Sequence, residues 1–218
     1  EGGGGIGTYT RDLTEGLAKA GHEPVVLART RRDERQEEIN GVTVCRYRMR
    51  ELPKGERFLP GIFWSRFLAK EIDRLHRDRP FDVVEFPNWE GVGYWYARRN
   101  PSRRAPVIVR LHTPFLECLE AGAKRRAGET FTCWLERRAV LAADHLICST
   151  RAHACMMAKT YGFDSEQVQI IPLGTTLPGD EELAAIYPFP EHEYNGAWPE
   201  IRRLDGTVIM SERSYFDS

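Results

Sequence analysis

Short apolar runs alternate with amphipathic stretches along most of the chain. The runs, rich in Val and Ile, predict strands at residues 24–28, 42–47, 81–86, 107–112, 145–150 and 168–173. Apolar residues spaced three or four apart predict helices at residues 6–17, 66–77, 92–99, 129–143 and 152–161. Strands that alternate with helices need crossover connections, which make neighbouring strands parallel. The pattern therefore predicts an α/β fold with a doubly wound, Rossmann-like parallel sheet.

The two ends of the chain depart from this alternation. A glycine-rich loop that opens a helix ordinarily follows a strand, but no apolar run precedes the glycines at 2–5. After Thr176 the alternation stops, and residues 177–204 hold four prolines without a clear period. We expect a Rossmann-like domain at 1–176 that lacks its first strand. An irregular tail at 177–218 follows, with one further strand at 205–210.

Composition narrows the class of protein. Hydrophobic residues make up 41% of the chain, enough for a real core and too many for wholesale disorder. The 31 Lys and Arg nearly balance the 32 Asp and Glu, which argues against nucleic acid as a partner. No apolar run approaches the roughly 18 residues of a membrane-spanning helix, and no signal peptide is visible. Five cysteines without a CxxC pair favour reduced thiols, so we expect a cytoplasmic protein.

Polar residues and glycines follow several of the predicted strands. Ligands of open α/β sheets bind outside the carboxyl ends of the strands. The residues expected at that edge are Glu85, Asn88, His112, Ser149, Thr150 and Gly174. Their concurrence at one edge predicts a ligand site there.

The glycine run adds a second part to this site. Glycines let a ligand approach the backbone closely, and a helix N-terminus offers free N–H groups to a phosphate or a sugar hydroxyl. The residues concerned are Gly4, Gly5, Ile6, Gly7 and Thr8. A flexible chain end would have the same composition, and the match of Gly2, Gly4 and Gly7 to G-x-G-x-x-G is weak without a preceding strand.

Each candidate also has a structural interpretation. His112 could serve as a structural histidine, and Glu85 could pair with a nearby Arg instead of binding hydroxyls or acting as a base. Ser149 and Thr150 precede a helix and fit an N-cap, while Cys148 lies in an apolar strand and fits the core. The remaining histidines lack metal-ligand spacing, so we expect no metal site.

An apolar stretch at residues 58–75 is flanked by Arg46, Arg48, Arg50, Lys54 and Arg57. Basic residues beside aromatic ones suit an anionic bilayer, so peripheral contact with a membrane is one interpretation. A core helix beside a solvated basic hairpin is the other, and the helical spacing favours it.

Taken in order, these segments resemble one family, the retaining family-4-type glycosyltransferases with the GT-B fold. The segment GGGGIGTYTRDLTEGLAKAGHEPVVLAR resembles the family's glycine loop, first helix and following strand. FDVVEFPNWEG resembles a strand and loop that line the acceptor side of the cleft, and VIVRLHTP the strand that ends in the cleft histidine, here His112. AADHLICST places Ser149 at the family's serine, and VQIIPLGTT places Gly174 at the interdomain hinge. The resemblance covers residues 3 to about 177.

The resemblance implies an enzyme that transfers a hexose from a nucleotide-sugar to a hydroxyl acceptor, with retention and without a metal or other cofactor. Its N-terminal domain mostly binds the acceptor and its C-terminal domain mostly binds the donor. The glycine loop approaches the donor phosphate, and the cleft histidine, His112, contacts the donor sugar. We find neither the basic pair nor the paired glutamates of the family's C-terminal domain, and the 42 residues after Thr176 are too few for one. We therefore expect the acceptor-side half of a transferase, inactive alone, whose partner is a missing C-terminal domain or a second copy at the cleft face.

Two other functions stay open at this point. An NADP-binding oxidoreductase domain would use Gly2, Gly4 and Gly7 as its fingerprint, with Arg29 or Arg31 at the 2′-phosphate. It leaves the other strand ends without a role. A non-catalytic binding or assembly module would instead present the cleft face to a partner protein.

Overall fold

Strands and helices alternate along the chain in the computed structural model, which describes residues 5–30, 32–48, 61–119, 126–174, 201–202 and 208–210. The chain divides into two units, Glu1–Thr176 and Leu177–Ser218. In the first unit the helices are α1 (Gly5–Lys19), α2 (Ile62–Asp78), α3 (Tyr94–Ala97), α4 (Ala127–Val140) and α5 (Arg151–Tyr161). Its strands are β1 (Val25–Thr30), β2 (Arg35–Ile39), β3 (Val42–Arg48), β4 (Val84–Pro87), β5 (Val107–Leu111), β6 (His145–Cys148) and β7 (Val168–Ile170). Short 3₁₀ turns are η2 (Trp89–Gly91), η3 (Pro101–Arg103), η4 (Phe115–Cys118) and η5 (Ser165–Gln167).

The strands form two sheets in this unit. The larger sheet is parallel, with the order β4-β5-β6-β7. The smaller has the order β1-β3-β2, with β1 parallel and β2 antiparallel to β3. The α/β class with a parallel sheet is confirmed. In the described residues, however, β1 and β4 are edge strands of separate sheets, where a single sheet was expected.

Strand β2, which pairs with the predicted strand β3 to form a hairpin, is an element that the hydrophobic pattern did not predict. The sequence of β2, RQEEI, is mostly polar and exposed, so it carries no apolar alternation. Its turn has a clear signature nevertheless: Asn40 and Gly41 both have positive φ, 52° and 78°. An Asn-Gly pair between two strands is the commonest two-residue hairpin signal.

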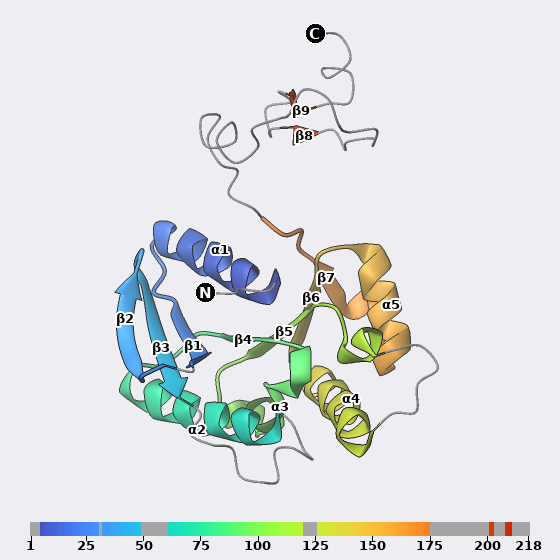
Figure 1. The fold of residues 1–218 in the computed structure, drawn as a ribbon, viewed down its shortest axis with the longest axis horizontal. Helices are drawn as coiled ribbons and strands as arrows, with labels where there is room; N and C mark the ends of the chain where they lie inside the picture. The colour runs from blue at the N-terminus through green and yellow to red at the C-terminus, as the bar shows by residue number, and fades with distance from the viewer. Residues whose placement is uncertain are drawn as a thin grey trace. The chain divides into compact units, whose positions relative to one another are not determined.

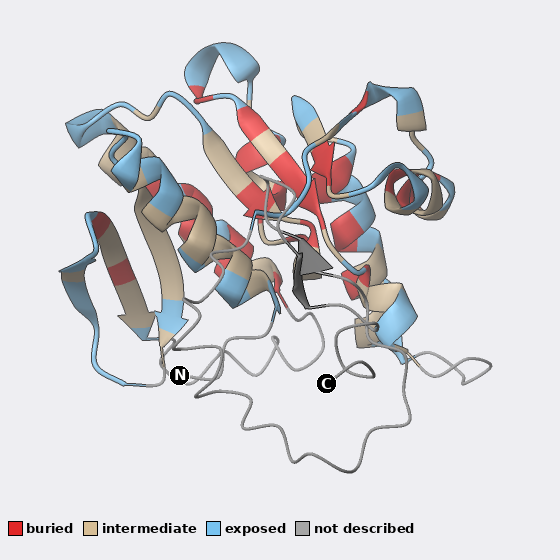
Figure 2. Cartoon of the chain, turned by 90° about the horizontal axis from the view of Figure 1, so that it is seen from above, coloured by how far each residue is buried: buried red, intermediate tan, exposed pale blue. Residues whose placement is uncertain are grey.

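The core lies in the four-stranded sheet and the helices beside it. Val107 and Val109 of β5 are fully buried, as a central parallel strand requires. Figure 2 shows the buried residues gathered in this part, whereas the three-stranded sheet is mostly of intermediate exposure. In Figure 1, α1 and α2 lie on opposite sides of the strands. Cys148 is buried in β6, as predicted.

Helix α2 resolves the question of the apolar stretch in favour of a core helix. It begins at Ile62, four residues earlier than predicted, so that Trp64 joins Leu68, Ala69 and Ile72 in the buried core. Arg46 pairs with Glu37 on the hairpin. Arg50, Lys54 and Arg57 lie outside the described residues.

Other boundaries differ where a glycine or a cap intervenes. The helix predicted at 92–99 is the four-residue α3, which begins after its N-cap Gly93; the preceding turn η2 ends at Gly91, whose φ is 60°. The strand predicted at 81–86 begins at Val84, and the strand predicted at 168–173 ends at Ile170. The strand predicted at 145–150 ends at Cys148, because the Thr150 hydroxyl caps α5 by accepting from the His153 N–H at 3.2 Å.

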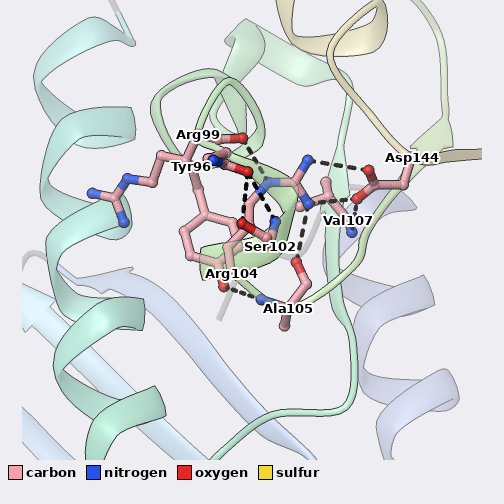
Figure 3. A network of polar contacts seen from close by, with 8 residues as sticks. Tyr96, Arg99, Ser102, Arg104, Ala105, Val107 and Asp144 are labelled. Atoms are coloured by element: carbon pink, nitrogen blue, oxygen red, sulfur yellow. Dashed lines mark hydrogen bonds and ion pairs between the residues drawn. The ribbon is translucent and has the colours of Figure 1, made fainter.

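An ion pair between the buried Arg104 and the exposed Asp144 ties together the amino ends of β5 and β6 (Figure 3). Asp144 accepts hydrogen bonds from Arg104 Nη1 at 2.5 Å and from the Val107 N–H at 2.7 Å. The Tyr96 hydroxyl accepts from the Ala105 N–H at 3.1 Å. The Arg104 guanidinium lowers the pKa of Asp144, so the carboxylate stays ionised. These contacts hold the end of the sheet opposite the predicted ligand edge.

In the second unit, strands β8 (Ile201–Arg202) and β9 (Val208–Met210) pair antiparallel. The strand predicted at 205–210 is thus confirmed over its described residues.

Candidate functional site

The carboxyl ends of β4 and β5 meet helix α1 in a small cluster of polar and aromatic side chains. Tyr9 of α1 donates its hydroxyl proton to Oε1 of Glu85 at 2.8 Å. The Arg110 guanidinium lies 4.5 Å from the centre of the Tyr9 ring, and its Nε is 3.7 Å from Glu85 Oε1. Arg110 is buried in β5 and also donates to the Ile171 carbonyl at 3.3 Å. This Tyr9–Glu85–Arg110 cluster joins the glycine segment to the two strand ends.

His112 stands beside this cluster, directly after β5. Its ring centre is 5.3 Å from that of Tyr9, in an edge-on arrangement. Its ring nitrogen Nε2 is buried and has no hydrogen-bond partner in the described part of the chain. The pKa of His112 is lowered to about 4, mainly by burial of the ring. The positive charge of Arg110 and the neighbouring His153 also contribute to the lowering of this pKa. The imidazole is therefore neutral near pH 7, with a free nitrogen that can bind a ligand hydroxyl.

The protonation states of Glu85 and Tyr9 follow from the same environment. Burial raises the pKa of Glu85, against the opposing effects of the Tyr9 hydrogen bond and the Arg110 charge. Burial and the Glu85 charge raise the pKa of Tyr9 above its usual range. Tyr9 therefore stays protonated and donates its hydrogen bond. Glu85 contacts an arginine, as the structural interpretation predicted, and also lies at the candidate site.

The glycine segment forms the first turn of α1. Gly5, Ile6, Gly7 and Thr8 lie in this turn, while Gly4 is outside the described residues, as are Gly2 and Arg31. Among the described residues, a Cβ atom added at Gly5 or at Gly7 would meet nothing within 4 Å. Packing within this part of the chain therefore does not require these two glycines.

Asn88 lies at the same edge but is fully buried. Its Oδ1 accepts from the His112 N–H at 2.7 Å, and its Nδ2 donates to the Tyr161 hydroxyl at 3.2 Å. Both ends of the amide are thus occupied by the protein, so the side chain is suited to holding His112 in place.

The remaining predicted residues lie further along the same edge. His112 and Ser149 each follow the last residues that pair β5 with β6, Leu111 and Cys148. Ser149 is half-buried, and Thr150 is exposed and caps α5. Gly174 is exposed, four residues beyond the end of β7.

The sequence pattern did not point to three residues at or beneath this edge: Tyr9, Arg110 and Glu136. Tyr9 fits the apolar spacing of the helix predicted at 6–17, so nothing in the pattern marked it as a polar contact. Arg110 lies inside the apolar run 107–112, where a charged residue is itself a signal of a buried polar contact. Glu136 of α4 is fully buried and accepts three hydrogen bonds, from the Glu90 N–H (2.9 Å), the Phe115 N–H (3.0 Å) and the Tyr161 hydroxyl (2.9 Å). Burial raises the pKa of Glu136 to about 7 in spite of these bonds. A glutamate in a predicted helix is ordinarily solvent-exposed, so the sequence gave no sign that Glu136 is buried.

The fold defines an α/β domain with a candidate ligand site at the carboxyl ends of parallel strands. A family model described as Glycosyltransferase Family 4 matches residues 3–177. The chain belongs to this family, as the resemblance predicted.

Two curated relatives carry the name D-inositol 3-phosphate glycosyltransferase. One is from Pseudarthrobacter chlorophenolicus and one from Paenarthrobacter aurescens, and each is 28% identical over 189 residues. The match covers 80% of this chain, and 43% and 44% of the two relatives. The chain thus spans less than half the length of these relatives. In the described part of the chain, no helix has both the length and the apolar character needed to span a bilayer.

Proposed function

We propose that this chain supplies the acceptor-side half of a site that transfers a glycosyl unit from a nucleotide-sugar to a hydroxyl group, with retention of configuration. The observation that carries the proposal is the Nε2 of a neutral imidazole, His112, at the end of β5, which is buried and has no hydrogen-bond partner among the residues that the structure describes. A buried polar atom without a partner is costly unless a ligand completes its hydrogen bonding. Family membership supports a sugar hydroxyl as that ligand.

The other residues of the edge have distinct roles in this proposal. The first turn of α1 brings backbone N–H groups and the positive end of the helix dipole to an open space, which suits the phosphate of a nucleotide-sugar. Tyr9 and Glu85 hold α1 over the strand ends through their hydrogen bond. Ser149 and Gly174 would contribute contacts at the margin of the same edge.

The acceptor class is proposed from the relatives. Both bear a name that specifies D-inositol 3-phosphate, so a polyhydroxylated acceptor with a phosphate is the first class to test. We further propose that the charge-stabilising groups for the departing diphosphate come from a second domain, so that the 218 residues alone transfer slowly or not at all. No bound metal is expected to take part, and EDTA should leave the rate unchanged.

The test uses the native protein, a panel of nucleotide-sugars and inositol 3-phosphate, with release of the nucleoside diphosphate as readout. His112→Ala should lower kcat/KM by about 100-fold, the order of magnitude for loss of one preorganised polar contact in the transition state. His145→Ala is the matched control, because His145 is exposed and lies at the amino end of the same sheet.

Three outcomes would contradict the proposal. Equal rates for the two variants would remove His112 from the site. Quenching of protein fluorescence by NADPH, without nucleotide-sugar binding, would favour the oxidoreductase interpretation. Full activity of the 218-residue chain would contradict the need for a second domain.

A further inference from the structure

The buried carboxyl group of Glu136 lies beneath the loops that follow β4 and β5. Its Oε1 accepts from the Glu90 N–H in the first loop, and its Oε2 accepts from the Phe115 N–H in the second. Glu136 therefore bridges two loops that neighbour each other only in the folded sheet, 46 and 21 residues away from it along the chain.

The same carboxyl group begins a chain of hydrogen bonds that ends at His112. The Tyr161 hydroxyl donates to Glu136 Oε2 at 2.9 Å and accepts from Asn88 Nδ2 at 3.2 Å. Asn88 Oδ1 in turn accepts from the His112 N–H at 2.7 Å. Glu136, Asn88 and Tyr161 are all buried, so water does not readily replace a lost partner.

Only a carboxyl group satisfies this arrangement. Two oxygen atoms accept from three donors, two of which are backbone N–H groups that cannot turn away. A glutamine has one carbonyl oxygen, so its NH₂ group would face either the Glu90 N–H or the Phe115 N–H. One buried donor would then be left without an acceptor.

We propose that Glu136 is a positioning residue, which holds the His112 backbone through Tyr161 and Asn88 and fixes the two loops on either side of the candidate site. The inference rests on the proposed function for its catalytic consequence. Its structural content is independent of that function, since the contacts do not involve a substrate. Glu136 itself touches no substrate in this proposal.

The first test is amide hydrogen exchange of the native protein at pH 8, above the pKa of Glu136. In Glu136→Gln the His112 amide and either the Glu90 or the Phe115 amide should exchange faster, by about tenfold, while the Val109 amide in the core of β5 keeps its wild-type rate. In Tyr161→Phe the His112 amide should exchange faster by a similar factor, while the Glu90 amide is unchanged, because its bond to Glu136 remains.

Glu129→Gln is the matched control on the same helix. Glu129 also accepts a backbone hydrogen bond, from the Arg126 N–H at 2.7 Å, but caps the start of α4 away from His112. It should leave all three site amides unchanged. If Glu136→Gln alters exchange at His112 no more than Glu129→Gln does, Glu136 is merely structural and the proposal is overturned.

Transfer kinetics supply the second readout. Positioning of His112 predicts that Glu136→Gln lowers kcat by about tenfold or more at little change in KM, and that Glu129→Gln changes neither. Native protein that includes the proposed second domain and still transfers no sugar would refute the proposed function, while the exchange pattern would still decide the role of Glu136. Faster exchange with unchanged kcat would show that the network does not position His112 for catalysis.

Discussion

The first turn of α1 and the loop that follows β4 are both rich in glycine, but the surroundings of these glycines differ. At Gly5 and Gly7 an added Cβ would meet no described residue within 4 Å. At Gly91 it would lie 2.7 Å from the backbone carbon and oxygen of Leu135 in α4, and at Gly93 it would lie 2.8 Å from the Phe86 ring. The glycines of α1 leave a space, whereas those after β4 permit close packing.

The two regions also differ in how deeply their side chains are buried. Helix α1 has no fully buried residue, and a prominent contact to the strand ends is made by Tyr9. The loop after β4 carries the fully buried Asn88 and packs on α4, where Leu135 and Glu136 are fully buried. A ligand site between these regions would have one firmly packed side and one side held mainly by polar and aromatic contacts.

The largest expected effect is that of Gly91→Ala on stability. The substitution places a Cβ against the Leu135 backbone at a residue with φ of 60°. Strain and overlap together should lower the free energy of unfolding by roughly 3 kcal/mol or more, measured by urea denaturation. Gly16→Ala, in open space on α1, is the control. A small loss at Gly91 would mean that α4 does not pack closely on this loop.

The next largest expected effect is a dependence of the free energy of unfolding on pH, caused by the titration of Glu136. Its pKa rises from 4.5 to about 7 on folding, so the folded protein binds a proton that the unfolded chain releases between these values. Stability from this group is present below pH 4.5 and is lost as the pH rises toward 7, by an amount on the order of 1–3 kcal/mol.

His112 acts in the opposite direction. Its pKa falls from 6.5 to about 4, so its contribution is present above pH 6.5 and lost as the pH falls toward 4. The two effects are separated by comparing wild type with Glu136→Gln in urea at each pH. The difference in their free energies of unfolding should shrink from pH 4.5 to pH 7. A difference that stays constant would show that Glu136 does not titrate in this range.

A smaller effect is expected for Tyr9→Phe. The phenylalanine keeps the ring beside Arg110 and His112 but loses the hydrogen bond to Glu85, at a cost of about 1 kcal/mol. The pKa of Glu85 should rise further, which carboxyl NMR would report. Tyr47→Phe loses a comparable bond, to Glu71 at 2.6 Å, and should leave nucleotide-sugar binding unchanged. Tyr9→Phe should weaken binding of the nucleotide-sugar, because Tyr9 holds α1 over the strand ends in the proposed site. If Tyr9→Phe and Tyr47→Phe bind the donor equally well, Tyr9 does not hold α1 over the site.

The smallest effect is a gain in stability. Gly7→Ala should raise the free energy of unfolding by about 0.5–1 kcal/mol, because alanine is favoured over glycine in a helix and meets no obstacle here. The same change should weaken nucleotide-sugar binding, since the methyl group enters the open space. A variant that is more stable and binds the donor as tightly as wild type would show that this space is not used.

Much of the fold could be predicted because its signals are local. Runs such as Val107–Leu111 and the helical spacing of Arg151–Tyr161 identified the larger sheet and its flanking helices. Boundaries failed where a turn residue acts, as at Gly91 and Gly93, and the polar strand β2 was missed because only its Asn-Gly turn marks it. The predicted role of Asn88 in substrate binding stays a prediction, although both ends of its side chain are engaged by the protein.

By itself the sequence determined the α/β class, the family, and the edge of the sheet where His112 stands, because all three depend on the order of short segments. Only the tertiary structure decided which side chains meet there. Tyr9 and Glu85 are 76 residues apart, and Asn88 and Tyr161 are 73 residues apart. Burial likewise depends on neighbours distant in sequence, and it sets the pKa values of His112 and Glu136. Contacts of this kind leave no local pattern, because the alternation of apolar and polar residues indicates which face of an element is buried but not what it is buried against.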